Sequence, residues 1–134
     1  MQIFGGTMAY SFIIMTNNEL VHSKYKDEFE VECKKESYED LLLRVRDRVH
    51  MGAKLLTHPL SGSVKPNETP FKTVFITKTK GDMDMRSLEI IENAIITAKK
   101  FPIRFPEMSD KMREDFALID LSLMESALPA ATQA

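Results

Sequence analysis

The chain has 134 residues, 43% hydrophobic and 28% charged, a balance typical of one folded domain rather than a disordered chain. Eighteen basic against twenty acidic side chains leave a formal charge of −2, and no window is dense in Lys and Arg, which disfavours nucleic-acid binding. No apolar run approaches the roughly 20 residues of a membrane helix, the first ten residues do not resemble a secretory signal, and the single cysteine cannot form an internal disulfide. We therefore expect a cytoplasmic protein without membrane contact.

The first half of the chain predicts two strands and two helices. "YSFIIMTNN" at residues 10–18 is a continuous apolar run, which predicts a buried central strand, and its terminal Asn pair can cap the helix that follows. "FEVEC" at residues 29–33 alternates apolar and polar side chains, as an edge strand does. Ser37, with Asp40 three residues later, predicts the start of a second helix, which Gly52 ends.

The second half predicts two more strands and two more helices. "KLLT" at residues 54–57 is a third short strand, and "KTVFIT" at residues 72–77 is a fourth. Asp84 caps a third helix, which "FPIRFP" interrupts, and Ser109 starts a last helix. We expect one domain over residues 1–134, with its core at about 10–127 and a frayed tail at 128–134. The last helix has apolar residues at helical spacing: Met112, Phe116, Ile119 and Leu123.

Alternation of strands and helices predicts a small three-layer α/β fold, with a mainly parallel sheet of about four strands and helices on both faces. Right-handed crossovers make the flavodoxin-like, or Rossmann-like, strand order 2-1-3-4 the simplest arrangement. The connection between the third and fourth strands, residues 58–71, has no helix and is short for a parallel crossover. An antiparallel fourth strand therefore remains open as an alternative.

A ligand site is expected where the chain order reverses, beyond the carboxyl ends of the first and third strands. In the assumed order these strands are neighbours, so "TNN" and "THPLSGS" would meet there. His58 can act as an acid, a base or a hydrogen-bond donor near neutral pH, and Gly and Ser backbone groups can surround a phosphate or a carboxylate. The predicted ligand-binding residues are Thr16, Asn17, Asn18, Thr57, His58, Ser61, Gly62, Ser63 and Lys65.

Each of these residues also has a structural explanation. A His before Pro in a turn often bonds the backbone, "SGS" is common in flexible connections, and an Asn after a strand often only caps a helix. The "SGS" stretch matches neither nucleotide-binding glycine motif. His22 and His50 have no second ligand at helical spacing, so we expect no metal site and no cofactor. Cys33 is expected to pack inward as an unreactive thiol.

"TNN" at residues 16–18 and "THPLSGSVKPNETPFK" at residues 57–72 resemble the GrdX family, over about residues 12–101. These are small proteins of anaerobic bacteria, encoded beside the components of selenium-dependent glycine reductase. The resemblance implies an accessory role in the reduction of glycine, sarcosine or betaine, with reductase components as partners. It carries over no catalytic residues. A site for a small carboxylate or phosphate would suit that setting.

Three functions follow, in descending order of support. The first is an accessory protein that binds a small anionic ligand at the His58 loop. The second is an assembly factor that docks a partner through the Pro-rich loop at residues 58–70, without catalysis. The third is a small enzyme in which His58 is the general acid or base and Ser61 or Ser63 is the nucleophile. The sequence is compatible with a homo-oligomer and does not identify the ligand.

Overall fold

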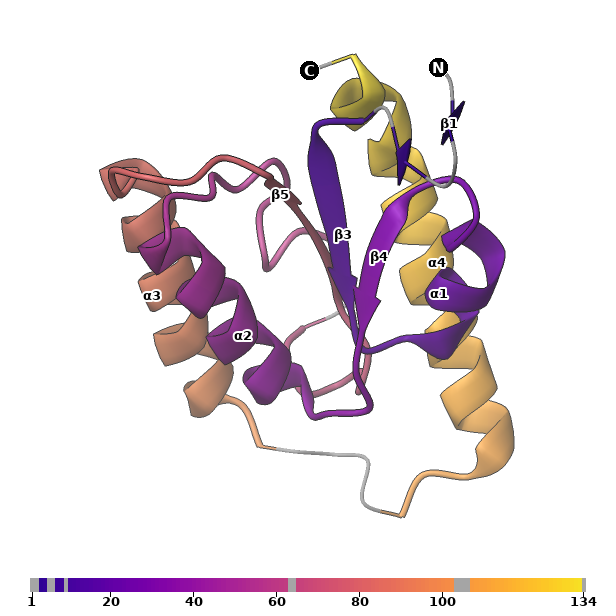
Figure 1. The fold of residues 1–134 in the computed structure, drawn as a ribbon. Helices are drawn as coiled ribbons and strands as arrows, with labels where there is room; N and C mark the ends of the chain where they lie inside the picture. The colour runs from indigo at the N-terminus through magenta and orange to yellow at the C-terminus, as the bar shows by residue number, and fades with distance from the viewer. Residues whose placement is uncertain (1–2, 5–6, 9, 63–64, 103–106, 134) are drawn as a thin grey trace.

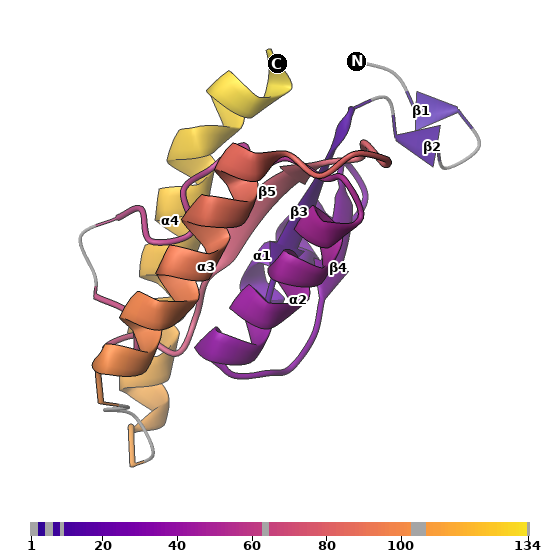
Figure 2. The same cartoon turned by 90° about the vertical axis from the view of Figure 1, so that its left-hand side faces the viewer.

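The computed structural model describes residues 3–4, 7–8, 10–62, 65–102 and 107–133 (Figure 1). Helices cover both faces of a small central sheet, with α2 and α3 on one side and α1 and α4 on the other (Figures 1 and 2). In chain order the elements are β1 (Ile3–Phe4), β2 (Thr7–Met8), β3 (Phe12–Thr16), α1 (Glu19–Tyr25), β4 (Glu30–Cys33), α2 (Tyr38–His50), β5 (Thr73–Thr77), α3 (Met85–Lys100) and α4 (Asp110–Thr132).

The central sheet has the strand order β4-β3-β5 and is mixed. β3 pairs in parallel with β4, where Ile14 lies opposite Val31, and antiparallel with β5, where Ile14 lies opposite Phe75. β1 and β2 form a separate antiparallel pair that stands apart from the layers (Figure 2). The prediction of four mainly parallel strands in the order 2-1-3-4 is therefore wrong, and the antiparallel alternative for residues 72–77 is correct.

The burial of the two candidate strands explains this difference. Residues 54–57 lie outside β5 and contribute only a single bridge, between Leu55 and Ile76, with hydrogen bonds on either side of it. The centre of a sheet covered on both faces selects strands that are apolar throughout. Val74, Phe75 and Ile76 are all buried, whereas Lys54 is exposed. β5 therefore takes the place beside β3, and "KLLT" is left at the edge.

The core consists of two clusters, one on each face of the sheet. Ile13 and Met15 of β3 face α2 and α3, while Phe12 and Ile14 face α1 and α4. This alternation is the period of a strand whose successive side chains point to opposite faces. The prediction that residues 10–18 contain a buried central strand is confirmed, since β3 is buried at every position.

Every predicted helix start is confirmed by its capping contact. The side chains of Asn18, Ser37, Asp84 and Ser109 accept hydrogen bonds from backbone N–H groups two or three residues later. Gly52 follows α2 with a φ of 111°, and a Cβ atom there would lie 2.5 Å from the backbone nitrogen of Gly81. The end of α2 therefore requires a glycine.

α4 differs from its prediction in its length and in its buried face. It continues through Thr132, across the tail expected to fray, because Ala131 packs in the cluster with Phe12 and Phe29. The buried positions of α4 are Ala117, Asp120, Met124 and Ala131. Most of the predicted apolar series faces outward: Met112 is 49% exposed, Ile119 42% and Leu123 36%.

Candidate functional site

A groove of about 830 Å³ opens at the carboxyl ends of β3 and β4. It lies between the beginnings of α1 and α2, residues 70–71 and the first half of α4. This volume is in the range of pockets that bind small organic ligands, roughly 300–1,000 Å³. The apolar part of the lining consists of Leu20, Pro70, Phe71, Ala117 and Leu118.

Asn17 and Asn18 line this groove, but their side chains bind the protein itself. The Asn17 amide donates to the carbonyl oxygens of Glu36 (3.0 Å) and Pro70 (2.8 Å), and its oxygen accepts from the Lys72 backbone N–H (2.9 Å). Asn17 therefore joins the end of β3 to the segments before α2 and β5. Because all three of these contacts are internal, the groove presents little of the Asn17 side chain to a ligand.

Asn18 connects α1 to α4. Its oxygen accepts from the Leu20 N–H (3.1 Å), and its amide donates to the Ala117 carbonyl oxygen (2.9 Å) and to Asp120 Oδ2 (3.0 Å). Both Asn residues thus fix the shape of the groove. Asn18 does so partly as the cap of α1, as predicted, whereas Asn17 does so through contacts with distant segments.

Asp120 is the centre of a buried polar cluster beneath the groove. Its Oδ2 accepts from Asn18 and from the Thr73 hydroxyl (2.8 Å), and Thr73 in turn contacts the Thr16 hydroxyl (2.8 Å). Burial raises the pKa of Asp120, and the hydrogen bonds from Asn18 and Thr73 and the charge of Lys72 oppose that shift. The cluster holds α4 against the ends of β3 and β5 through polar contacts.

Lys72 lies between the two segments that were predicted to form the site. Its backbone contacts Asn17, while its Nζ donates to the Ser61 carbonyl oxygen at 2.7 Å. Burial lowers the pKa of the Lys72 ammonium, and the charge of Asp120 opposes the shift. A cavity of only about 10 Å³ adjoins Lys72, Asp120 and Ser61, which is room for about one water molecule.

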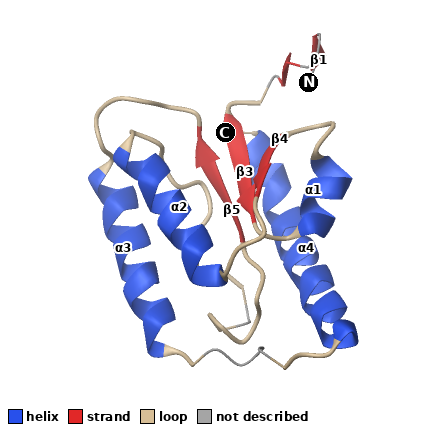
Figure 3. Ribbon diagram, turned by 60° about the horizontal axis from the view of Figure 1, so that its bottom comes forward, coloured by secondary structure: helices blue, strands red, loops and turns tan. Residues whose placement is uncertain are grey.

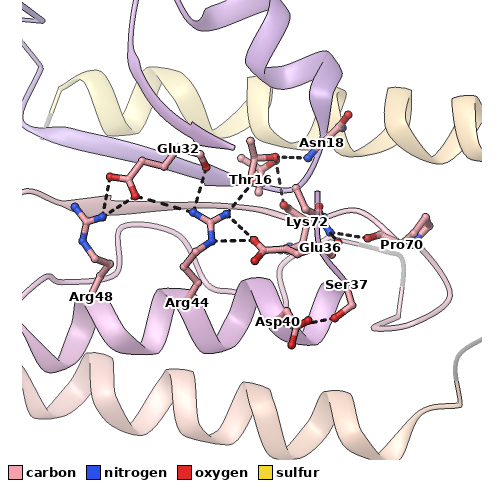
Figure 4. Close-up of polar contacts among 12 residues, drawn as sticks. Thr16, Asn18, Glu32, Glu36, Ser37, Asp40, Arg44, Arg48, Pro70 and Lys72 are labelled. Atoms are coloured by element: carbon pink, nitrogen blue, oxygen red, sulfur yellow. Dashed lines mark hydrogen bonds and ion pairs between the residues drawn. The ribbon is translucent and has the colours of Figure 1, made fainter. Parts of the chain in front are cut away.

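An ion-pair network fixes α2 against β4 beside the groove (Figure 4). Arg44 donates to Glu36 Oε2 (2.6 Å) and to the Thr16 carbonyl oxygen (3.1 Å), and Arg48 pairs with Glu32 (2.6 Å). Glu36 lines the groove, but its charge is compensated by Arg44.

Four other charged side chains line the groove: Glu19, Lys35, Arg113 and Glu114. None of them forms an ion pair within the residues that the structure describes. The Arg113 guanidinium lies 5.8 Å from the centre of the Phe71 ring, which is within cation–π range. The groove thus combines an apolar wall with charges available to a ligand.

The loop after residues 54–57 lies at the same end of the sheet, beyond β5 rather than beside β3 (Figure 3). The Nδ1 atom of exposed His58 accepts from the Leu60 N–H at 3.1 Å, and the Thr57 hydroxyl accepts from the Phe75 N–H at 3.0 Å. Neither residue lines the groove. The expected meeting of two loops therefore does not occur, because β5 occupies the position between them.

Ser61, Gly62 and Lys65 of this loop are also outside the groove. Ser61 and Gly62 are exposed, and a Cβ atom on Gly62, whose φ is 109°, would lie 2.8 Å from Leu123 Cδ1. Lys65 is exposed, and Ser63 lies outside the described residues. Of the eight predicted site residues that the structure describes, only Asn17 and Asn18 line the groove, while Thr16 belongs to the cluster beneath it.

The rest of the loop anchors α3. Asn67 is buried, has a φ of 66°, and donates to the carbonyl oxygens of Ala98 (2.9 Å) and Phe101 (3.0 Å). These are groups that the end of a helix leaves without partners. Pro59, Pro66 and Pro70 are buried as well. The loop is therefore largely a structural element.

Sequence reasoning missed the residues that α4 and the segment before β5 contribute. Phe71 lies within "THPLSGSVKPNETPFK" but had no predicted role, and Arg113, Glu114 and Asp120 belong to no motif. Only an aspartate within an otherwise apolar stretch, "FALIDLSLM", hinted at a buried carboxyl group.

Within the described residues, no three His, Cys, Asp or Glu side chains gather as metal ligands do. The described helices include none that is long and apolar enough to cross a membrane.

Comparison with curated proteins and with solved structures found no match. A family model described as GrdX-like protein matches residues 13–129, which is most of the chain and includes both the groove and the loop. The family predicted from "TNN" and "THPLSGSVKPNETPFK" is confirmed: the chain belongs to the GrdX-like protein family.

Proposed function

We propose that this protein is an accessory protein of the selenium-dependent glycine reductase system, including its sarcosine and betaine branches, and that it binds an organic ligand with an anionic group in the groove. Family membership supports the metabolic setting. The observation that carries ligand binding is the groove itself, because Lys35 and Arg113 line it without an ion pair among the described residues. An anionic group in the groove is attracted by both positive charges and breaks no ion pair of the described residues.

The structural role of the loop at residues 57–70 weakens the two alternatives. A docking surface needs groups that are available to a partner. Asn67 and the three prolines of this loop are buried, so the prolines that suggested docking are not on its surface, although His58, Ser61, Gly62 and Lys65 are exposed. The predicted enzyme needs a serine hydroxyl hydrogen-bonded to the His58 ring, and among the described residues the ring's hydrogen-bond partner is the Leu60 backbone N–H. Neither alternative gains a specific observation in its favour.

Thermal unfolding against a panel of small anions tests this function. The panel contains phosphate, acetate, acetyl phosphate, 3-phenylpropanoate and common nucleotides. A ligand at about 100 times its dissociation constant stabilises the folded state by roughly 2.7 kcal/mol, which raises the melting temperature by several degrees in a domain of this size.

Two variants decide where the ligand binds. We expect Arg113→Gln to reduce the shift caused by the best anion and His58→Ala to leave it unchanged, because only Arg113 lines the groove. If the anion no longer raises the melting temperature of His58→Ala but still raises that of Arg113→Gln, the ligand binds at the loop and not in the groove. A panel without any shift would contradict the proposed ligand binding.

A further inference from the structure

The groove contains acidic groups that a purely anionic ligand would leave without a partner. Glu19 and Glu114 line the same groove as Lys35 and Arg113, and neither forms an ion pair among the described residues. A bare anion attracted by the two basic side chains also meets the field of the two carboxylates. The charge of the groove therefore suits a ligand that carries both signs.

The charges are distributed over two walls of the groove. α4 supplies Arg113 and Glu114, which are adjacent in the sequence, while α1 supplies Glu19 and the connection before α2 supplies Lys35. Each wall thus offers one cation and one anion. A carboxylate and an ammonium group held a few ångströms apart can each find a partner of opposite charge on either wall.

Apolar surface fills the space between these charges. Leu20 is 40% exposed and Leu118 is 54% exposed, and both line the groove with Phe71 and Ala117. A volume of about 830 Å³ is far larger than the two charged groups of an amino acid need. A ligand with an apolar body would remove this surface from water, whereas a bare ion would leave it exposed.

We infer that the groove binds an apolar zwitterion of the α-amino-acid type, either as a free amino acid or as a short peptide. The inference rests on the proposed function and narrows its ligand class. Arg113 and Lys35 bind the carboxylate, Glu19 and Glu114 bind the ammonium group, and the side chain packs against Phe71 and Leu118.

Isothermal titration of the full chain with four related compounds tests the inference. Phenylalanine carries both charges, 3-phenylpropanoate lacks the ammonium group, phenethylamine lacks the carboxylate, and glycine lacks the apolar body. We expect phenylalanine to bind up to about fivefold more tightly than 3-phenylpropanoate and phenethylamine, because an exposed charge pair contributes up to about fivefold. We also expect it to bind more tightly than glycine, because glycine has no apolar side chain to bury. Titration with the dipeptide Gly-Phe shows which ligand the groove prefers: tighter binding than phenylalanine indicates a short peptide, and weaker binding indicates the free amino acid.

Each outcome of the titration separates this inference from the proposed function. If 3-phenylpropanoate binds as tightly as phenylalanine, the inference is wrong while the proposed anion site stands. If glycine binds as tightly as phenylalanine, the apolar part of the inference is wrong. If phenethylamine binds most tightly, or if none of the compounds binds, the inference is wrong, and the proposed anion site is then decided by the phosphate and nucleotide arms of the thermal-unfolding panel.

Charge-removing variants test the assignment of the residues. We expect Glu114→Gln to weaken the binding of phenylalanine and to strengthen the binding of 3-phenylpropanoate. We expect Arg113→Gln to weaken the binding of both compounds. Arg86→Gln and Glu89→Gln on α3 are matched controls, since both positions are exposed and lie outside the groove. An equal effect of Glu114→Gln on both compounds would overturn the assignment of the ammonium group.

Discussion

The loop at residues 57–70 and the groove differ in how their polar groups are used. The loop contains His58, two serines and Asn67, residue types that often form sites, yet the contacts of His58 and Asn67 are made with the protein's own backbone. The groove is lined by common charged residues such as Lys35 and Arg113, which have no ion pair among the described residues. A candidate site is thus indicated by groups that the fold leaves without partners rather than by residue type.

The largest effect is expected at Asn17, which connects the groove to the loop. Asn17→Ala would leave the Glu36 and Pro70 carbonyl oxygens and the Lys72 N–H without their partner, at a cost of about 3–5 kcal/mol in the free energy of unfolding. Urea-induced unfolding measures this difference. Asn93→Ala, on the exposed side of α3, is the matched control and should change stability by less than about 0.5 kcal/mol. Equal costs for the two variants would show that Asn17 does not hold the segments together.

Asn67 tests the structural role of the loop. Asn67→Ala removes two hydrogen bonds at the end of α3 and puts alanine, which tolerates the left-handed region less well than asparagine, at a φ of 66°, so we expect a loss of about 2–3 kcal/mol in the free energy of unfolding. Glycine adopts this φ readily, so Asn67→Gly should reduce the free energy of unfolding by about 1 kcal/mol less than Asn67→Ala does. Urea unfolding ranks the two variants.

The folded Asn67→Gly variant also separates the loop from the groove. We expect it to bind phenylalanine as the unchanged chain does, because Asn67 does not line the groove. A large loss of affinity in this variant would mean that the loop contributes to binding.

The smallest effect concerns the buried carboxyl group of Asp120. Its pKa is raised in the folded protein, so the folded state binds the proton more tightly than the unfolded chain, whose Asp pKa is about 3.9. Asp120 therefore contributes increasing stability as pH falls through its folded-state pKa, and it costs stability above that pKa. Asp120→Asn keeps an oxygen that can accept from Asn18 and Thr73 and cannot ionise.

We expect the stability of Asp120→Asn, relative to the unchanged chain, to decrease by about 1 kcal/mol between pH 7 and pH 4. Urea unfolding at several pH values measures this difference, and the other titrating groups cancel in the comparison. If the stability of Asp120→Asn relative to the unchanged chain stays constant or increases as the pH falls from 7 to 4, burial does not raise the pKa of Asp120.

The sequence correctly predicted the elements whose signals are local. The unbroken apolar run identified β3, and the caps at Asn18, Ser37, Asp84 and Ser109 located four helix starts. These signals depend on contacts within a few residues of the chain, such as a side-chain oxygen and the N–H group two or three residues later. The family was also determined by the sequence, because "THPLSGSVKPNETPFK" is a long and specific stretch.

The tertiary structure alone decided the strand order, and with it the position of the candidate site. "KLLT" and "KTVFIT" compete for the place beside β3, and the competition depends on how much apolar surface each strand buries between two helical layers. Likewise, Asp120 lies on the buried face of α4 because it accepts hydrogen bonds from Asn18 and Thr73. These partners lie 102 and 47 residues away in the chain. Local patterns cannot encode such contacts, because the free energy of a buried hydrogen bond depends on which distant groups the fold brings within reach.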